Sequence, residues 1–215
     1  MNYFRLLFSN NSILRILQKD EFQKMILNGS CIEFGANHKI ERNFLNFKSK
    51  KYQTVYSNID KKNKNFLYLD LKKKTNHKKK YNNIVIFNVL EHLSDVNMPL
   101  KNLYFLLKKN GKLFGSTPFI YRVHGAPNDY QRFTKSYLKK MLIEKKFKDV
   151  QIKELGLGPF LASVSLLRGY LKYLPILNQI LVGFALIIDL FSSIFMKTNP
   201  KSIYPIGYVF SATKK

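Results

Sequence analysis

The stretch YNNIVIFNVLEHLSDVNMPLKNLYFLLKKNGKLFGSTPF, residues 81–119, decides the fold. It contains two short apolar runs, IVIF (84–87) and KLFGS (112–116), which are typical of buried strands. Between them, leucines recur at helical spacing over residues 96–109, and Asn110-Gly111 supplies a stop. Strand, helix and strand in succession predict a parallel sheet with helices packed on its faces.

The same alternation continues on both sides of this stretch. A helix is predicted over residues 12–27, and another from its N-cap Thr134 through Lys146. We therefore predict a single α/β domain over residues 1–215, with a doubly wound, mostly parallel sheet. Further strands are predicted at residues 31–34, 53–59, 66–69, 150–155 and 206–214.

Length and composition agree with one domain. With 215 residues, 46% of them hydrophobic, the chain is long enough to bury a substantial core. The formal charge of +24 would fit a polyanionic partner, but the lysines are scattered along the chain, so charge alone does not predict one. The lone cysteine, Cys31, excludes a disulfide framework and a cysteine-rich zinc site and fits a reducing compartment. No secretory signal is recognisable.

Chemically suggestive residues follow four of the predicted strands. In an open parallel sheet, ligands bind at the carboxyl ends of the strands. Asp60 lies 25 residues after Gly35, near the spacing at which an acid binds ribose hydroxyls, and no second glycine is present to cradle a pyrophosphate. This pattern favours a nucleoside without phosphates and argues against NAD. In strand order, the candidates are Glu33, Gly35 and Asn37, then Asp60, then Asp70 and Leu71, then Asn88.

Residues 81–119 resemble the fourth and fifth strands of class I S-adenosylmethionine-dependent methyltransferases of the type 11 group. That family typically has a hydrophobic strand, a Leu-Glu-His turn, a helix ending in Leu-Lys-x-x-Gly and a strand ending in Pro-Phe. The loop HGAPNDYQRFT, residues 124–134, is similar to a branch with His-Gly-x-Pro-x-Asp-Tyr-x-Arg-Phe-Thr after the fifth strand. In this chain the hydrophobic strand lies at residues 84–87, the Leu-Glu-His turn at 90–92, the Leu-Lys-x-x-Gly end of the helix at 107–111 and the Pro-Phe end of the strand at 118–119.

The resemblance implies a Rossmann-like fold and S-adenosylmethionine as the cofactor. It implies that Glu33 orients the amino-acid end of the cofactor, that the backbone at Gly35 passes beside it, and that Asp60 holds the ribose. Further cofactor contacts are implied for Asp70 and Leu71 at the adenine, for Asn88 near the methionine portion, and for Asn37 at the position of the family's second glycine.

The loop 124–134 brings polar groups to the end of the fifth strand. His124 is a candidate general base for an acceptor hydroxyl, because an imidazole pKa lies near working pH, and its alternative role is to hold the loop. Asp129, Tyr130 and Arg132 are candidates for binding the acceptor. The spacing of three residues nevertheless favours an ion pair between Asp129 and Arg132.

The turn at Glu91-His92 also suits a metal ion, and some methyltransferases with this turn hold magnesium there. The additional acid expected at residue 88 is asparagine in this chain. We therefore predict no metal site, and we expect His92 to pack and form hydrogen bonds at the turn.

Residues 157–200 depart from a minimal methyltransferase. The segment YLPILNQILVGFALIIDLFSSIFM, residues 173–196, has Asp189 as its only charge. A single membrane crossing would separate the final strand from the sheet that it completes. We predict an apolar insertion of two helices, joined near Leu174-Pro175, that contacts the membrane surface; a helical cap or a dimer interface is the alternative.

The predicted function is S-adenosylmethionine-dependent O-methylation of a small or lipid-linked acceptor, such as a cell-surface saccharide precursor. We expect a cytoplasmic protein, peripheral at the cytoplasmic face of the membrane. An RNA methyltransferase is one alternative, but the turn after the fourth strand lacks the Asn/Asp-Pro-Pro-aromatic pattern used on base amines, so no nucleic-acid partner is expected. The other alternative is a non-catalytic membrane-associated module. It is suggested by Asn37, which stands where the family usually has a second glycine.

Overall fold

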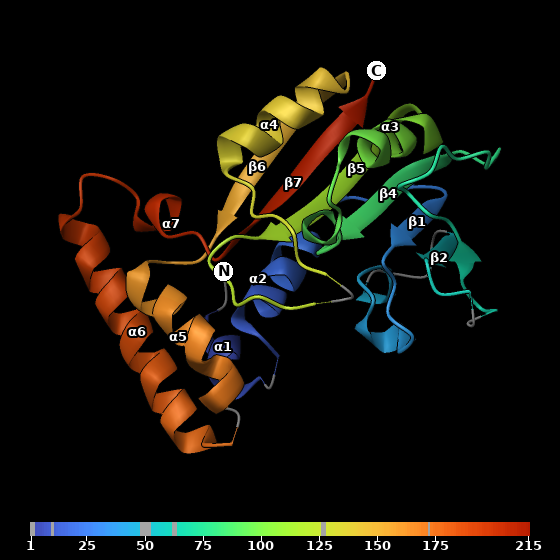
Figure 1. Ribbon diagram of the computed structural model, residues 1–215. Coiled ribbons are helices and arrows are strands. Elements are labelled where there is room, and N and C mark those ends of the chain that lie inside the picture. The colour runs from blue at the N-terminus through green and yellow to red at the C-terminus, as the bar shows by residue number, and fades with distance from the viewer. Residues whose placement is uncertain (1–2, 10, 48–52, 62–63, 126–127, 172) are drawn as a thin grey trace. The chain divides into compact units, whose positions relative to one another are not determined.

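The computed structural model contains a seven-stranded sheet with the order β3-β2-β1-β4-β5-β7-β6 (Figure 1). The pairs β1–β2, β1–β4, β2–β3 and β4–β5 are parallel. The sheet is therefore the mostly parallel, Rossmann-like sheet that the sequence predicted. The described residues are 3–9, 11–47, 53–61, 64–125, 128–171 and 173–215.

All seven predicted strands are present. Two short helices, α1 and α7, were not predicted. The strands are β1 (Cys31–Phe34), β2 (Thr54–Asn58), β3 (Leu67–Tyr68), β4 (Tyr81–Phe87), β5 (Leu107–Pro118), β6 (Phe147–Leu155) and β7 (Gly207–Lys214). The helices are α1 (Phe4–Phe8), α2 (Ile13–Phe22), α3 (Asn97–Leu106), α4 (Lys135–Glu144), α5 (Pro159–Leu171), α6 (Pro175–Phe195) and α7 (Pro200–Ile203), with short 3-10 turns η1 (Ile40–Arg42), η2 (Leu45–Phe47) and η3 (Leu90–His92).

The helix predicted over residues 96–109 is shorter in the structure. α3 ends at Leu106, and β5 begins at the next residue. Tyr81 pairs with Leu107 and Asn83 pairs with Lys112, so β5 carries extra residues between two neighbouring pairs. Asn110 has a φ of 59°, which makes the turn within this extra segment. The Asn-Gly signal therefore marks an irregularity in a strand and not the end of a helix.

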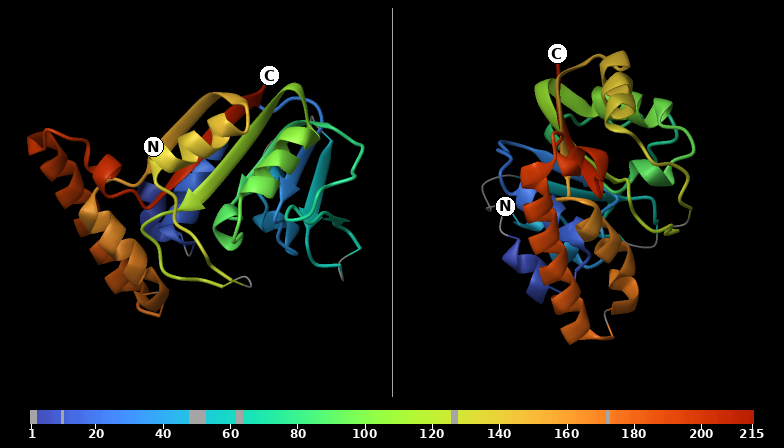
Figure 2. Two further views of the ribbon diagram at one scale, coloured as in Figure 1. Left: turned by 45° about the horizontal axis from the view of Figure 1, so that its top comes forward. Right: turned by 90° about the vertical axis from the view of Figure 1, so that its left-hand side faces the viewer.

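The chain divides into two compact units, which are described separately. Unit 2 comprises Met25–Thr117, His124–Ile152 and Val209–Lys215. Ile84, Val85 and Ile86 of its strand β4 are fully buried, as expected for a parallel strand covered on both faces. Figure 2 shows α3 and α4 on one face of the sheet. The carboxyl ends of β1, β2 and β4 all belong to this unit.

Unit 1 comprises Met1–Lys24, Pro118–Val123 and Lys153–Tyr208. The two helices predicted for the apolar insertion are present in it as α5 and α6, which lie side by side (Figures 1 and 2). Pro175 starts α6, as expected for a residue that lacks a backbone N–H group.

Two buried charged side chains hold the helices of unit 1 together. The carboxylate of Asp189 on α6 accepts hydrogen bonds from the backbone N–H groups of Phe160 (3.1 Å) and Leu161 (2.8 Å), at the start of α5. Arg168 on α5 donates to the carbonyl oxygen of Leu6 on α1 at 2.9 Å and to that of Ser9. A carboxylate suits a helix N-terminus and a cation suits a C-terminus, so both charges cap neighbouring helices.

Candidate functional site

A cavity of about 330 Å³ lies at the carboxyl ends of β1, β2 and β4 in unit 2. The turns that follow these strands form its walls, together with the loop after β3 and part of the loop 124–134. Five of the predicted cofactor residues line it: Gly35, Asn37, Asp70, Leu71 and Asn88. Tyr130, Asn128 and His92 also line it, and so do His38 and Asn58.

Gly35 occupies the turn directly after β1. Its φ is +67°, in the left-handed region that favours glycine. A Cβ atom at this position would lie 2.4 Å from Cγ2 of Val89, in the turn after β4. The two turns therefore pack against each other with no room for a side chain, and the backbone of residue 35 forms the cavity wall.

Asn37 takes the place of the second glycine of the family. It is not among the described residues with positive φ. Its backbone N–H donates to Oδ1 of Asn43 at 2.6 Å, and its carbonyl oxygen accepts from Nδ2 of Asn43 at 3.1 Å. Because the Asn43 side chain is buried, it holds the turn in a fixed conformation. The only sequence signal for Asn43 is a polar residue beside Phe44 and Leu45.

Glu33, the predicted ligand of the amino-acid end of the cofactor, is buried on β1 and is not among the residues that line the cavity. Its Oε1 accepts from the backbone N–H of Phe44 (3.0 Å), and its Oε2 accepts from that of Leu45 (2.9 Å). Glu33 therefore fixes the segment that follows the Gly35 turn, and the role expected for it at the cofactor stays a prediction.

Asp60, the predicted ribose ligand, lies two residues beyond β2. Its neighbours Asn58 and Ile59 line the cavity, whereas Asp60 itself does not. Its carboxylate is 39% exposed, and Oδ2 lies 3.4 Å from Nε2 of His38, which does line the cavity. Asn58 donates to the carbonyl oxygen of Ala36 at 2.6 Å and so ties the end of β2 to the turn after β1.

The loop after β3 carries Asp70 and Leu71, the residues implied for the adenine. Buried Asn102 of α3 holds this loop, because its Nδ2 donates to the carbonyl oxygens of Leu71 (2.8 Å) and Lys73 (2.7 Å). Its Oδ1 accepts from the backbone N–H of Thr75 at 3.2 Å. Asn102 was not among the predicted site residues, although a polar residue within a leucine-rich helical pattern is a usable signal.

Asn88 follows β4 with a φ of 56°, an uncommon conformation for a residue with a side chain. Its backbone N–H donates to the carbonyl oxygen of Ser116 on β5 at 2.9 Å. The neighbouring parallel strand β5 thus holds Asn88 in this strained conformation at the cavity wall. The family resemblance implies that the methionine portion of a cofactor lies near this residue.

The loop 124–134 is organised around Asp129. Its carboxylate forms two hydrogen bonds with the guanidinium of Arg132, one of them 2.6 Å long, which confirms the pair favoured by the sequence. It also accepts from the backbone N–H of His124 at 2.9 Å. The Arg132 guanidinium holds the pKa of Asp129 well below its usual range. Tyr130 lines the cavity, whereas His124, Asp129 and Arg132 do not; Ala126 and Pro127 lie outside the described residues.

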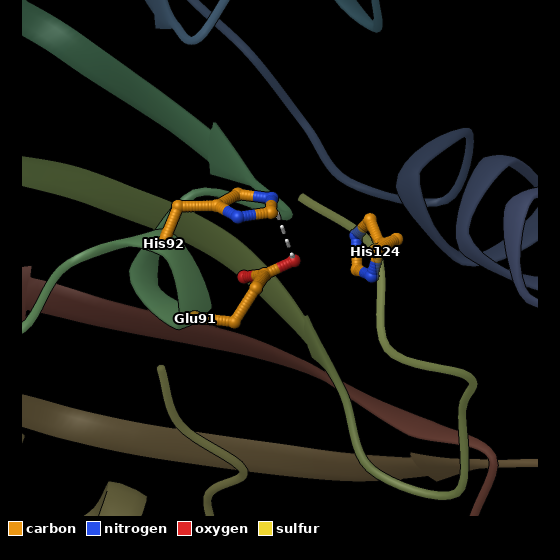
Figure 3. A group of neighbouring side chains, drawn as sticks. All are labelled: Glu91, His92 and His124. Carbon is orange, nitrogen blue, oxygen red and sulfur yellow. Dashed lines mark ion pairs between the residues drawn. The ribbon is translucent and has the colours of Figure 1, made fainter. Parts of the chain in front are cut away.

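The turn η3 meets this loop (Figure 3). Glu91 is fully buried, and its carbonyl oxygen accepts from the backbone N–H of Tyr130 at 2.8 Å. Burial raises the pKa of the Glu91 carboxyl to about 8. Nε2 of His92 lies 3.9 Å from Oε1 of Glu91, and the rings of His92 and His124 are 5.0 Å apart in an edge-to-face arrangement.

A family model described as a methyltransferase domain matches residues 7–150. The match covers more than half of the chain and includes every strand end that lines the cavity. The chain belongs to this methyltransferase domain family. A search of curated proteins found no match.

Solved methyltransferases share the fold at low sequence identity. An S-adenosylmethionine-dependent methyltransferase from Archaeoglobus fulgidus has a TM-score of 0.59 and 14% identity, covering 100% of both chains. Phosphoethanolamine N-methyltransferase 2 of Haemonchus contortus, solved with phosphomonomethylethanolamine and S-adenosylhomocysteine, has a TM-score of 0.57 and 12% identity over 99% of this chain. This chain covers only 56% of the length of that protein. The CurJ carbon methyltransferase has a TM-score of 0.55 and 12% identity, covering 100% of this chain and 61% of that one.

Proposed function

We propose that this protein transfers a methyl group from S-adenosylmethionine to an oxygen atom of a small or lipid-linked acceptor, such as a cell-surface saccharide precursor. One observation carries the proposal. Asn128 and Tyr130, from the loop that contains His124, line the same cavity as Gly35 and Asn88. The segments expected to hold the cofactor and the acceptor therefore share one enclosed space.

The residues at the strand ends suit the cofactor. A cavity of about 330 Å³ is within the range of small-molecule sites, and the Gly35 turn lets the backbone approach a ligand closely. S-adenosylmethionine supplies a methyl group on a positively charged sulfonium. Asp70 and Leu71 are proposed to flank its adenine, Asp60 to bind its ribose, and Asn88 to contact its methionine portion.

The loop 124–134 is proposed to position the acceptor, as the resemblance to one branch of the family implies. Direct displacement needs alignment and exclusion of water more than strong acid or base chemistry, and Tyr130 on the cavity wall serves the first need. Nδ1 of His124 lies 3.3 Å from Oδ2 of Asp129, so the aspartate orients the imidazole that is proposed to accept the hydroxyl proton.

Incubation with S-adenosylmethionine labelled in its methyl group and with fractionated cell extract tests the function. Label in a lipid or saccharide fraction, on an oxygen atom, supports the proposal, whereas label in RNA supports the alternative enzyme. If calorimetry detects no binding of S-adenosylmethionine or S-adenosylhomocysteine, the protein is a non-catalytic module of this fold.

The apolar insertion suggests that the protein binds its acceptor at a membrane surface. Among the described residues, α6 is the one helix long and apolar enough to cross a membrane. Its single charge, Asp189, is buried as the cap of α5, so α6 stays paired with α5 in a hairpin. We propose that the exposed face of α6 lies on an anionic membrane surface. This face consists of Ile176, Leu177, Ile180, Phe184, Ile187, Leu190, Phe191, Ile194 and Phe195.

Sedimentation with anionic vesicles tests this contact. Wild-type protein should sediment, and Phe184→Asp should remain in the supernatant, because a charge on the exposed face opposes insertion among the lipids. Ile143→Asp is the matched control, since Ile143 is an exposed apolar residue on α4 in the other unit. If wild-type protein stays monomeric without detergent and does not sediment, the membrane proposal is wrong and the helices act as a folded cap.

A further inference from the structure

Glu91, His92 and His124 form a cluster of metal-binding side chains at the junction of η3 and the loop 124–134. One ligand atom from each residue lies within 4.8 Å of the other two (Figure 3). Glu91 and His92 follow β4, whereas His124 lies beyond β5, the neighbouring parallel strand in the sheet. The cluster is therefore created by the sheet topology.

The carboxylate of Glu91 points to a ligand. It is fully buried, and within the described part of the chain neither of its oxygen atoms has a hydrogen-bond partner. A buried carboxylate without such a partner is costly, so native proteins usually pair it with a cation or a metal ion. The charge of Arg132 attracts the Glu91 carboxylate, but the Arg132 guanidinium forms its hydrogen bonds with Asp129 and leaves both Glu91 oxygen atoms without one.

The two imidazoles are held in a form that suits metal binding. Nδ1 of His92 lies 2.5 Å from the carbonyl oxygen of Asn128, and Nδ1 of His124 lies 3.3 Å from the carboxylate of Asp129. An acceptor next to Nδ1 places the ring proton there and leaves the lone pair on Nε2. Metal-binding histidines are usually oriented in this way by a carbonyl or a carboxylate.

We propose that Glu91, His92 and His124 bind a divalent transition-metal ion of the zinc class. Two imidazole nitrogens and one carboxylate oxygen are a ligand set of catalytic zinc sites, which keep a further position open for water or substrate. Magnesium is a poorer candidate, because it prefers oxygen ligands. The sequence-based prediction of no metal rested on Asn88; the structure brings His124 close to the turn, where it would be the third ligand.

Only a modest adjustment would close the site. Three ligand atoms that each lie about 2.0–2.2 Å from one zinc ion are closer to one another than the candidate ligand atoms of Glu91, His92 and His124 are in the structure. His124 lies on the loop after β5 and its side chain is 27% exposed, so we assign the adjustment to this residue. His92 also lines the main cavity, so a metal ion bound to it would lie next to that cavity.

The consequence for catalysis rests on the proposed function. A metal ion at this position would bind the acceptor hydroxyl and make its proton easier to remove. His124 would then act as a ligand and not as the base. The binding site itself does not depend on methyl transfer, so metal binding and cofactor binding are measured separately.

Calorimetric titration of chelator-treated full-length protein with zinc chloride tests the site, and cobalt(II) absorption reports the coordination geometry. We expect one equivalent of zinc to bind, with His124→Ala and Glu91→Gln each weakening its affinity by at least about 100-fold. Asp129→Asn, which alters a positioning residue, should weaken it by about 10–100-fold. His77→Ala is the matched control, because His77 stacks on Tyr81 outside the cluster. Cys31 is buried and does not compete for metal.

Zinc binding that is unchanged in both His124→Ala and Glu91→Gln would overturn the proposal, as would the absence of saturable zinc binding. Circular dichroism and binding of S-adenosylhomocysteine verify that each variant is folded. If a variant is unfolded, His124→Gln, at a partly exposed position, supplies the decisive comparison. Zinc binding without cofactor binding would preserve the metal site and reject the proposed function.

Discussion

Gly35→Ala tests the geometry of the cavity wall most directly. Alanine at a φ of +67° costs about 1–2 kcal/mol, because its Cβ crowds the following carbonyl oxygen. The same Cβ would lie 2.4 Å from Cγ2 of Val89, and forcing an extra carbon atom into such a contact costs about 1–3 kcal/mol. We expect the free energy of unfolding to fall by about 2–5 kcal/mol in total.

The conformational and the steric contributions to the cost of Gly35→Ala can be separated. Cβ of Val89 would lie 3.8 Å from the new atom, an ordinary contact, so Val89→Ala removes the clashing Cγ2 together with Cγ1, which is not in contact with the new atom. The free energy of unfolding is measured in urea titrations followed by circular dichroism. After correction for the effect of Val89→Ala alone, the double variant Gly35→Ala/Val89→Ala should no longer show the steric part of the loss, whereas the conformational part should remain.

Gly169→Ala is the matched control for the glycine itself. Gly169 lies in α5, and a Cβ there meets no atom within 4 Å. This variant should gain about 0.5–1 kcal/mol, the usual preference for alanine in a helix. A cost below about 0.5 kcal/mol for Gly35→Ala, or no recovery in the double variant, would refute the packing argument for the two turns.

Three further predictions concern side chains of unit 2. Asp60→Ala should weaken cofactor binding by about 1.5–3 kcal/mol through loss of charge-assisted hydrogen bonds, and unchanged affinity in calorimetry would remove Asp60 from the site. Asn43→Ala should lower the free energy of unfolding by about 1–3 kcal/mol, because two backbone groups of Asn37 lose their partner, whereas Asn37→Ala keeps both bonds and should cost less in the same urea titration. Burial raises the pKa of the Cys31 thiol from 9.0 to about 11. Below pH 9, the reaction of this thiol with a disulfide reagent should therefore be at least about 100-fold slower in the native protein than in urea. Equal rates would contradict the burial of Cys31.

The positions of the strands along the chain and the position of the cavity could be predicted from the sequence because both depend on local patterns. Residues 84–87 of β4, IVIF, are apolar throughout, as expected for a strand covered on both faces. Gly35 and Asn88 were found because they follow such strands directly, and strand ends of a parallel sheet meet at one edge.

The supporting contacts could not be predicted in the same way. Asn102 lies on α3 and holds a loop 29 to 31 residues earlier in the chain, and its partners are backbone carbonyl groups, which have no sequence signature. Glu91 and His124 are 33 residues apart in the sequence, and their proximity depends on the path of the loop after β5. Side-chain contacts of this kind follow from tertiary structure, so only the structure reveals them.

The replacement of a family glycine by Asn37 shows how such contacts change the interpretation of a sequence. A second glycine serves a turn that needs positive φ or very close approach of a ligand, and its absence suggested loss of cofactor binding. Asn37 does not have positive φ, and the reciprocal hydrogen bonds with Asn43 define its backbone conformation instead. The turn therefore keeps one glycine, at the position where Val89 leaves no space, and stabilises the second position with a buried amide. Since Asn37 lines the cavity together with Gly35, its departure from the family pattern is a change in how the wall is held and is no argument against a cofactor site.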